Sequence, residues 1–167
     1  LAVGLGYAHK MEYVLVMVDP RGGAGKTRFF STLAPAHLIK DSLTLDLTDK
    51  DSIKTATSCW MAELGELDGT FRKSDQASLK AFGSKHVAGM RMRYGRTDNK
   101  YPRRTAFFAS VNSVEFLVDN TTNRRFWPIR VDAVNHLHTT DMQQLWAQIH
   151  CEIQMGCTWH LEDEEAR

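Results

Sequence analysis

Cysteine, proline and long apolar runs are scarce in this chain. Its three cysteines, at positions 59, 151 and 157, are odd in number and follow no disulfide pattern, which argues against a disulfide scaffold and favours a reducing compartment. The histidines and cysteines at positions 150–160 lack the spacing of a common zinc site. No apolar run approaches the ~20 residues of a membrane helix, and no basic start leads into an apolar region. We therefore expect neither a membrane span nor a signal peptide.

The composition is that of an ordinary soluble globular protein. The chain has 167 residues, of which 43% are hydrophobic and 25% are charged, which suits one domain with a sizeable core. We therefore predict a single domain over residues 1–167. Because the first residue is Leu1 rather than methionine, we also expect the chain to be part of a longer protein.

Positive charge is concentrated in one segment. The overall charge is +1, but ten of the 21 Lys and Arg residues lie between Arg72 and Arg104, against two Asp residues, so this segment carries +8. Such a block in a near-neutral protein suggests an anionic partner such as nucleic acid. The alternative is a solvated basic face, and composition alone does not choose between the two.

A glycine-rich run is the most informative motif in the chain. It follows the apolar segment 13–18 and precedes a predicted helix over residues 27–36, which is the context of a phosphate-binding loop. Glycines allow backbone N–H groups to surround phosphate oxygens, Lys26 would reach the β- and γ-phosphates, and the Thr27 hydroxyl would bind Mg²⁺. The sequence thus predicts ATP and Mg²⁺ as cofactors, with the nucleotide held by Gly22, Gly23, Ala24, Gly25, Lys26, Thr27 and Arg28.

This motif departs from the full pattern at one position. Pro20 stands where the pattern has a glycine, five residues before Gly25. A chance Gly-x-Gly-Lys-Thr in an unrelated loop is the alternative, and the preceding strand argues against it.

Strands alternating with helices predict an α/β fold. We expect a central, mainly parallel sheet covered by helices on both faces, with the nucleotide at the carboxyl ends of the strands. A glycine-punctuated basic loop or hairpin is expected over residues 83–104. The predicted strands are 13–18, 42–46, 58–64, 105–111 and an edge strand at 126–131, and the predicted helices are 27–36, 49–57, 74–82 and 141–155.

Polar residues at the ends of two predicted strands complete a candidate active site. Glu63 ends a buried strand and could hold the Mg²⁺ shell or orient the attacking water. Glu66 could be a second acid, or could face solvent. Asn112 could bind the γ-phosphate or the water, or could simply cap its strand. Arg124 and Arg125 could supply positive charge to a transferring phosphoryl group, or form a surface ion pair.

The basic segment also contains aromatic residues. Phe82, Tyr94 and Tyr101 are interleaved with its positive charges, a pattern that suits single-stranded nucleic acid because aromatic faces stack on unpaired bases. For Phe82 itself, a core position is the favoured interpretation. The residues that we expect to face DNA are Lys80, Lys85, His86, Arg91, Arg93 and Arg96.

At this point the chain resembles the virulence-associated E family, which is related to superfamily-three helicases and to the primase-helicases of phage satellites. Nearly the whole chain takes part in the resemblance. Besides Pro20, two positions depart from the family's usual pattern: Thr122 stands in place of glycine and Arg93 in place of proline. The motifs that carry it are GGAGKT, WMAELGELDG, LKAFGSKHVAGMRMRYGR, FFASVN, NRRFWPIRV and LWAQIHCEIQMGCTWHLEDEE.

The resemblance implies a P-loop NTPase fold of the AAA+ type and an ATPase that moves along DNA during replication of a phage or mobile element. It implies that Lys26 and Thr27 form the Walker A motif and that Glu63 is the Walker B acid. By the same resemblance Asn112 is the sensor amide, and Arg124 or Arg125 acts in a neighbouring subunit of a hexameric ring. We expect single-stranded or forked DNA as partner and the host cytoplasm as location.

The sequence therefore favours the core of an ATP-dependent DNA helicase or translocase. A nucleotide-gated DNA-binding module without strand separation is the first alternative. A small-molecule kinase is the second, although a small substrate needs no surface of charge +8.

Overall fold

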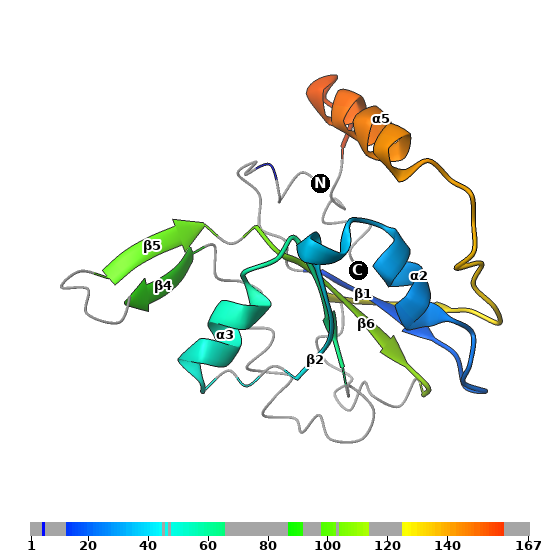
Figure 1. The fold of residues 1–167 in the computed structure, drawn as a ribbon, viewed down its shortest axis with the longest axis horizontal. Helices are drawn as coiled ribbons and strands as arrows, with labels where there is room; N and C mark the ends of the chain where they lie inside the picture. The colour runs from blue at the N-terminus through cyan, green and yellow to red at the C-terminus, as the bar shows by residue number, and fades with distance from the viewer. Residues whose placement is uncertain are drawn as a thin grey trace.

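The computed structural model describes residues 5, 13–44, 46, 48–65, 87–91, 98–102, 104–113 and 125–158. These residues form a five-stranded sheet in which every neighbouring pair is parallel, so the predicted α/β class with a central parallel sheet is confirmed. The strand order is β2-β3-β6-β1-β7 (Figure 1). The strands are β1 (Val14–Val18), β2 (Ile39–Leu43), β3 (Met61–Leu64), β6 (Ala106–Val111) and β7 (Phe126–Arg130).

β7 is the edge strand that the sequence predicts. It pairs with β1, in a register that sets Pro128 beside Val16, and it ends the strand order. Proline cannot donate a hydrogen bond to a second neighbour, which is why it is tolerated at an edge. Within the basic segment, β4 (Val87–Arg91) and β5 (Asp98–Pro102) pair antiparallel as a separate two-stranded sheet.

β2 lies nearer the N-terminus than the predicted strand 42–46. The extended backbone begins at Ile39, paired with Met61, and a turn replaces it at Asp46. There the Asp46 Oδ1 accepts hydrogen bonds from the N–H and the hydroxyl of Thr48. An Asp side chain that bonds the backbone two residues ahead favours a turn over a strand, so the alternating pattern at 42–46 was misleading.

Two helices cover the sheet close to the predicted positions. α3 (Lys50–Ala56) begins at Asp49, whose carboxylate accepts from two backbone N–H groups, and this confirms the predicted cap. α2 (Lys26–Thr32) ends earlier than predicted. Pro35 lies three residues beyond its end and disfavours helical backbone at the residue before it, so a short 3₁₀ turn, η1 (Ala36–Leu38), follows instead.

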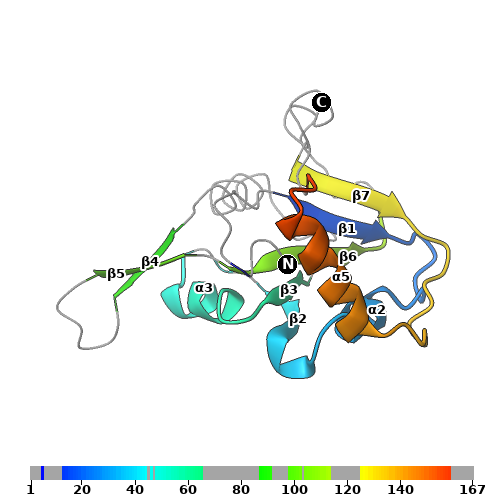
Figure 2. The ribbon, with the colours of Figure 1, turned by 90° about the horizontal axis from the view of Figure 1, so that it is seen from above.

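α5 (Met142–Gln154) matches the predicted C-terminal helix. Its Trp146 indole donates to the Leu33 carbonyl at 2.6 Å and packs against Trp60, with ring centroids 4.9 Å apart. Trp146 thus attaches α5 to the C-terminal end of α2. Figure 2 shows the ribbons of the two helices next to each other. Among the described residues, no helix is long and apolar enough to cross a membrane.

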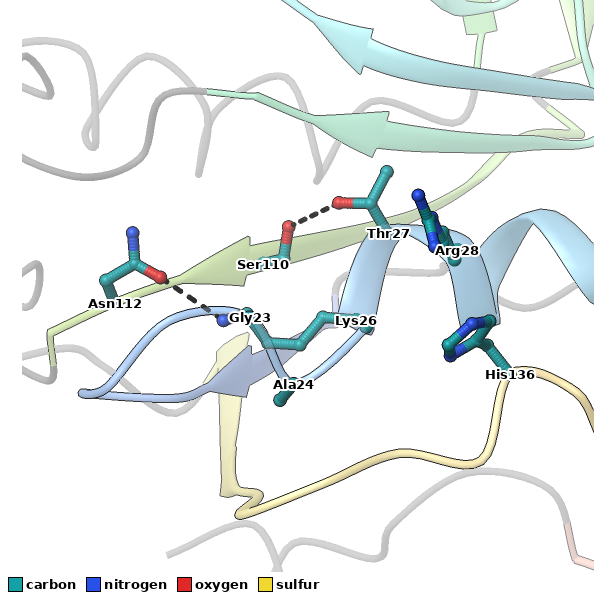
Figure 3. Close-up of a pocket in the computed structure, with 9 residues that line it drawn as sticks. Gly23, Ala24, Lys26, Thr27, Arg28, Ser110, Asn112 and His136 are labelled. Atoms are coloured by element: carbon teal, nitrogen blue, oxygen red, sulfur yellow. Dashed lines mark hydrogen bonds between the residues drawn. The ribbon is translucent and has the colours of Figure 1, made fainter.

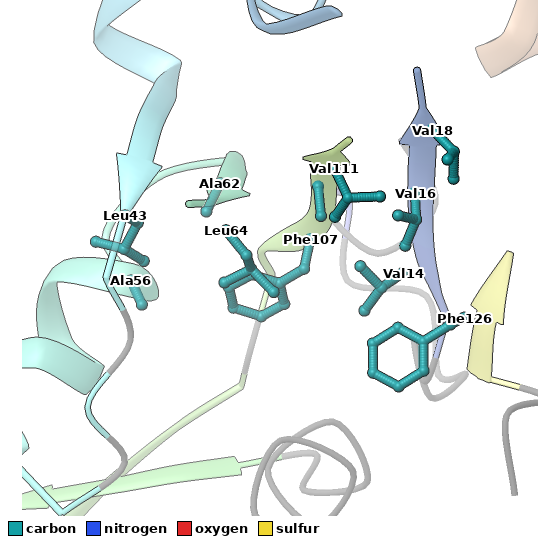
Figure 4. Packing of buried hydrophobic residues seen from close by; sticks show 11 residues of the cluster. Val14, Val16, Val18, Leu43, Ala56, Ala62, Leu64, Phe107, Val111 and Phe126 are labelled. Carbon is teal, nitrogen blue, oxygen red and sulfur yellow. The ribbon is translucent and has the colours of Figure 1, made fainter. Parts of the chain in front are cut away.

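Two apolar clusters lie on opposite faces of the sheet, because successive side chains of a strand point to opposite sides. The first cluster includes Ala56 of α3 (Figure 4), and the partly buried Ile53 of the same helix packs against this cluster. The second includes Phe30 of α2, stacked on Phe108 with centroids 3.8 Å apart. The sheet is therefore the middle of three layers. The first cluster consists of Val14, Val16, Val18, Leu43, Ala56, Ala62, Leu64, Phe107, Ala109, Val111 and Phe126.

Candidate functional site

The glycine-rich run forms a tight loop between β1 and α2. Gly22, Gly23 and Gly25 all have positive φ angles, of 72°, 85° and 81°, a region that glycine enters without strain. Gly25 is also closely packed, since a Cβ atom there would lie 2.8 Å from the His136 Nδ1 atom. The loop can therefore have this shape only with glycine at position 25.

Asp19 holds this loop closed. It directly follows β1, is 1% exposed, and its carboxylate accepts from the N–H groups of Arg21 (3.0 Å) and Ala24 (2.9 Å). Burial alone would raise the pKa of Asp19, but these N–H groups and the charge of Lys26 outweigh it, and the pKa lies below its ordinary value of 3.8. Pro20 is exposed and leaves this bonding intact.

Lys26 and Asn112 meet at the mouth of the loop, as the sequence predicts. The Lys26 Nζ donates to the Asn112 Oδ1 at 3.2 Å (Figure 3) and lies 3.7 Å from the Asp19 Oδ2. The lysine is only 8% exposed, and a charge so deeply buried requires partners of this kind. The meeting follows from the topology, because β1 and β6 are parallel neighbours and end together.

Glu63 forms a second group with two hydroxyls. Its Oε1 accepts from Thr27 Oγ1 at 2.8 Å and from Ser110 Oγ at 2.6 Å, and the two hydroxyls are 3.2 Å apart. Glu63 is 2% exposed and lies beside Phe108 in the sheet register. One carboxylate with hydroxyl oxygens is a donor set that suits Mg²⁺, which prefers oxygen ligands and completes its shell with water and phosphate.

Both groups contribute side chains to one cleft of about 540 Å³, which Glu63 reaches only through the hydroxyls of Thr27 and Ser110. Its walls are residues 23–28 of the loop and α2, Ser110 and Asn112 at the end of β6, and His136 after β7. A cleft of this size accommodates a small ligand. Of the predicted cofactor-binding residues, those at positions 23–28 line it directly.

Three residues of this region were missed by sequence reasoning. Asp19 carried the same signal as Glu63, an acid at the end of an apolar strand. Ser110 carried a weaker one, a hydroxyl inside the apolar run that leads to Asn112. His136 carried none, because it is 111 residues away from Gly25 in the sequence and only the fold brings the two together.

The remaining predicted site residues lie elsewhere. Arg125 immediately precedes β7. It therefore lies where the parallel strands begin, whereas the cleft lies at the opposite end, where they finish. Arg91 belongs to β4. The other predicted residues lie outside the described part of the chain, together with the predicted helix 74–82: Glu66, Lys80, Lys85, His86, Arg93, Arg96 and Arg124.

A family model for the virulence-associated protein E-like domain matches residues 5–167. The chain belongs to this family. The match extends over nearly the whole chain and confirms the resemblance that the sequence motifs indicated. No curated protein matches the chain.

Solved structures with this fold include two apo A-form structures of the NrS-1 C-terminal region. One has a TM-score of 0.51 and 14% sequence identity, and the match covers 87% of this chain and 36% of that one. The other has a TM-score of 0.50 and 10% identity, and covers 96% of this chain and 40% of that one. The likeness establishes a shared fold, and the chain spans well under half the length of these two structures.

Proposed function

We propose that the chain is the ATP-hydrolysing core of a helicase or translocase that acts in replication of a phage or mobile element. One observation carries the proposal. A buried lysine, two hydroxyls and an amide, from the first turn of α2 and the end of β6, line a single cleft, and a buried carboxylate of the neighbouring strand β3 accepts from both hydroxyls. Such a constellation is suited to phosphoryl transfer, in which catalysis is mainly positioning and charge stabilisation.

Each residue has a role that its chemistry supports. Lys26 would neutralise the terminal phosphates of ATP, and in doing so would exchange its bond to Asn112 for charge-assisted bonds to phosphate oxygens. Asn112 would then bind the γ-phosphate or the attacking water. The carboxylate of Glu63 accepts from the Thr27 and Ser110 hydroxyls. It would orient the attacking water and accept its proton.

The oxygen atoms of these residues suit Mg²⁺, which would supply positive charge to stabilise the transferring phosphoryl group. Thr27 and Glu63 are the residues that would hold it, with Ser110 within hydrogen-bond reach of both. Ser110 would keep the carboxylate in position, because its hydroxyl donates to the same Oε1 atom that accepts from Thr27.

The place of Arg125 supports an active site shared between subunits. The residue lies at the opposite edge of the sheet from its own chain's cleft, so it could reach only the cleft of a neighbour. This suits the ring assembly, most simply a hexamer, that the family resemblance implies. The basic segment that includes β4 and β5 would bind DNA, since ten Lys and Arg residues lie within it.

The test is ATP hydrolysis measured with and without single-stranded DNA over a range of protein concentrations. We expect turnover to rise with both, because DNA engages the basic segment and association completes the shared site. Arg125→Ala should retain ATP binding and lose turnover. DNA affinity that responds to ATP without any turnover would instead favour the nucleotide-gated DNA-binding module, and turnover indifferent to DNA would contradict a helicase.

A further inference from the structure

Residues 131–138 form a strap that follows β7 and runs along the glycine loop. The Val131 N–H donates to the Val18 carbonyl at 2.9 Å, and the Val134 N–H donates to the Ala24 carbonyl at 3.0 Å. The strap therefore continues the pairing of β7 with β1 beyond the sheet and onto the loop itself, in the yellow-to-orange part of the ribbon (Figure 1). Its backbone is fixed relative to the residues that would surround phosphate.

Side chains anchor the strap on both sides of His136. Asp132 forms an ion pair with Arg21 of the loop at 2.8 Å, and the His138 Nε2 lies 2.8 Å from the Thr32 hydroxyl of α2. The first pair is exposed and contributes little stability on its own. Together with the backbone bonds, however, the two contacts determine where the strap places His136.

The His136 ring lies against Gly25 and lines the cleft. Figure 3 shows it near Arg28, at the end of the cleft away from Asn112. Within the described part of the chain the ring itself makes no hydrogen bond, in contrast to the ring of His138. A half-buried imidazole with a flat face, a donor and an acceptor is thus presented to the cleft.

The direction of a bound nucleotide follows from the proposed function, on which this inference rests. If Lys26 and Asn112 take the terminal phosphates, the nucleoside extends toward the opposite end of the cleft, where Arg28 and His136 lie. We propose that His136 recognises the nucleoside part of the nucleotide, by stacking on the base or by a hydrogen bond to the ribose or base. His136 is then a binding residue, and the phosphates are left to the loop.

The test compares ligands with and without a nucleoside. Dissociation constants for ATP, ADP and inorganic tripolyphosphate, each with Mg²⁺, are measured for the 167-residue chain and for His136→Ala. We expect ATP and ADP binding to weaken on the order of tenfold, the effect typical of losing one base-stacking side chain, while tripolyphosphate binding stays unchanged. Leu137→Ala, on the same strap but with a side chain that is 80% exposed, is the matched control and should leave all three unchanged.

Each other outcome has a definite meaning. Equal weakening of all three ligands would mean that the ring only shapes the loop around Gly25, and would overturn the inference, as would no change for any ligand. If wild type binds tripolyphosphate but neither nucleotide, the proposed function fails as well. His136→Gln serves as a second variant should His136→Ala unfold, which thermal unfolding reports.

Discussion

The two faces of the sheet differ in what they bury. On the face toward α3, the side chains that alternate along β1, β3 and β6 are apolar from one end to the other and form the first cluster. On the face toward α2, β3 and β6 carry the apolar side chains of Met61 and Phe108. They then become polar two residues later, at Glu63 and Ser110, which bond to each other.

This difference separates stability from chemistry within single strands. Because side chains repeat every second residue on one face, Phe107 and Phe108 are neighbours in sequence but belong to different layers. The α3 face can be packed for stability without regard to a ligand. The α2 face combines an apolar core under Phe30 with a buried carboxylate, that of Glu63, near the carboxyl end of β3. This carboxylate is tolerated there because two hydroxyls donate hydrogen bonds to it.

The largest expected effect is that of Glu63→Gln on the polar end of the α2 face. We expect ATP turnover to fall by about 10²–10⁴-fold, the usual contribution of a positioned acid or base. ATP binding and folding should be retained, because the Gln carbonyl oxygen still accepts from Thr27 and Ser110. Steady-state hydrolysis and calorimetric binding measure the two quantities.

Glu152→Gln is the matched control for Glu63→Gln. Glu152 is an exposed carboxylate of α5, bonded to Gln148, and its replacement should leave turnover unchanged. Equal turnover in Glu63→Gln and wild type would show that the catalytic acid lies elsewhere.

The next effect is that of Phe107→Ala on the apolar face. Phe107 is 5% exposed, and removing a buried Phe side chain costs about 3–5 kcal/mol of unfolding free energy. Urea titration measures the loss. At a urea concentration where both proteins are folded, ATP affinity should be unchanged, and a change would contradict the separation of the two faces. Ile129→Ala, on exposed β7 surface, should cost far less.

The smallest effect is that of Asp19→Asn on the pH dependence of stability. The pKa of Asp19 is lower in the folded chain than its ordinary value of 3.8. Its charged form therefore stabilises the fold above that value, and this contribution is lost as the pH falls through the lower, folded pKa. We expect the unfolding free energy of Asp19→Asn to fall less than that of wild type between pH 5 and the acid limit, measured by denaturant titration at each pH.

Asp46→Asn provides a comparison outside the cleft. Hydrogen bonds from Thr48 lower the pKa of this exposed carboxyl as well. Its replacement should therefore also reduce the loss of unfolding free energy at acid pH, while leaving ATP affinity unchanged. An Asp19→Asn variant with the full acid dependence of wild type would show that the loop does not stabilise the charged carboxylate.

The meeting of Lys26, Thr27, Glu63 and Asn112 could be predicted from the sequence. Apolar runs marked the strands, and parallel strands of one sheet bring their carboxyl ends to one edge. The apolar spacing of 142–153 likewise predicted α5.

The remainder depended on interactions that are not local in the sequence. The position of β2 was set by the Asp46 turn and by pairing with β3, neither of which the alternation at 42–46 expresses. His136 reaches the cleft only through the bonds of the strap to Val18 and Ala24. A role for Ser110 in the site can be inferred only once the fold shows that Glu63 and Thr27 lie within hydrogen-bond distance of it.

The most direct test of the account is Mg²⁺–ATP binding, measured by titration calorimetry on wild type and on Lys26→Ala. Charge-assisted hydrogen bonds of one lysine predict that the variant binds roughly 10- to 150-fold more weakly, with hydrolysis abolished and the fold retained. Lys54→Ala, an exposed lysine in the last turn of α3, should bind as wild type does. Equal ATP affinity in Lys26→Ala and wild type would contradict the assignment of this cleft as the nucleotide site.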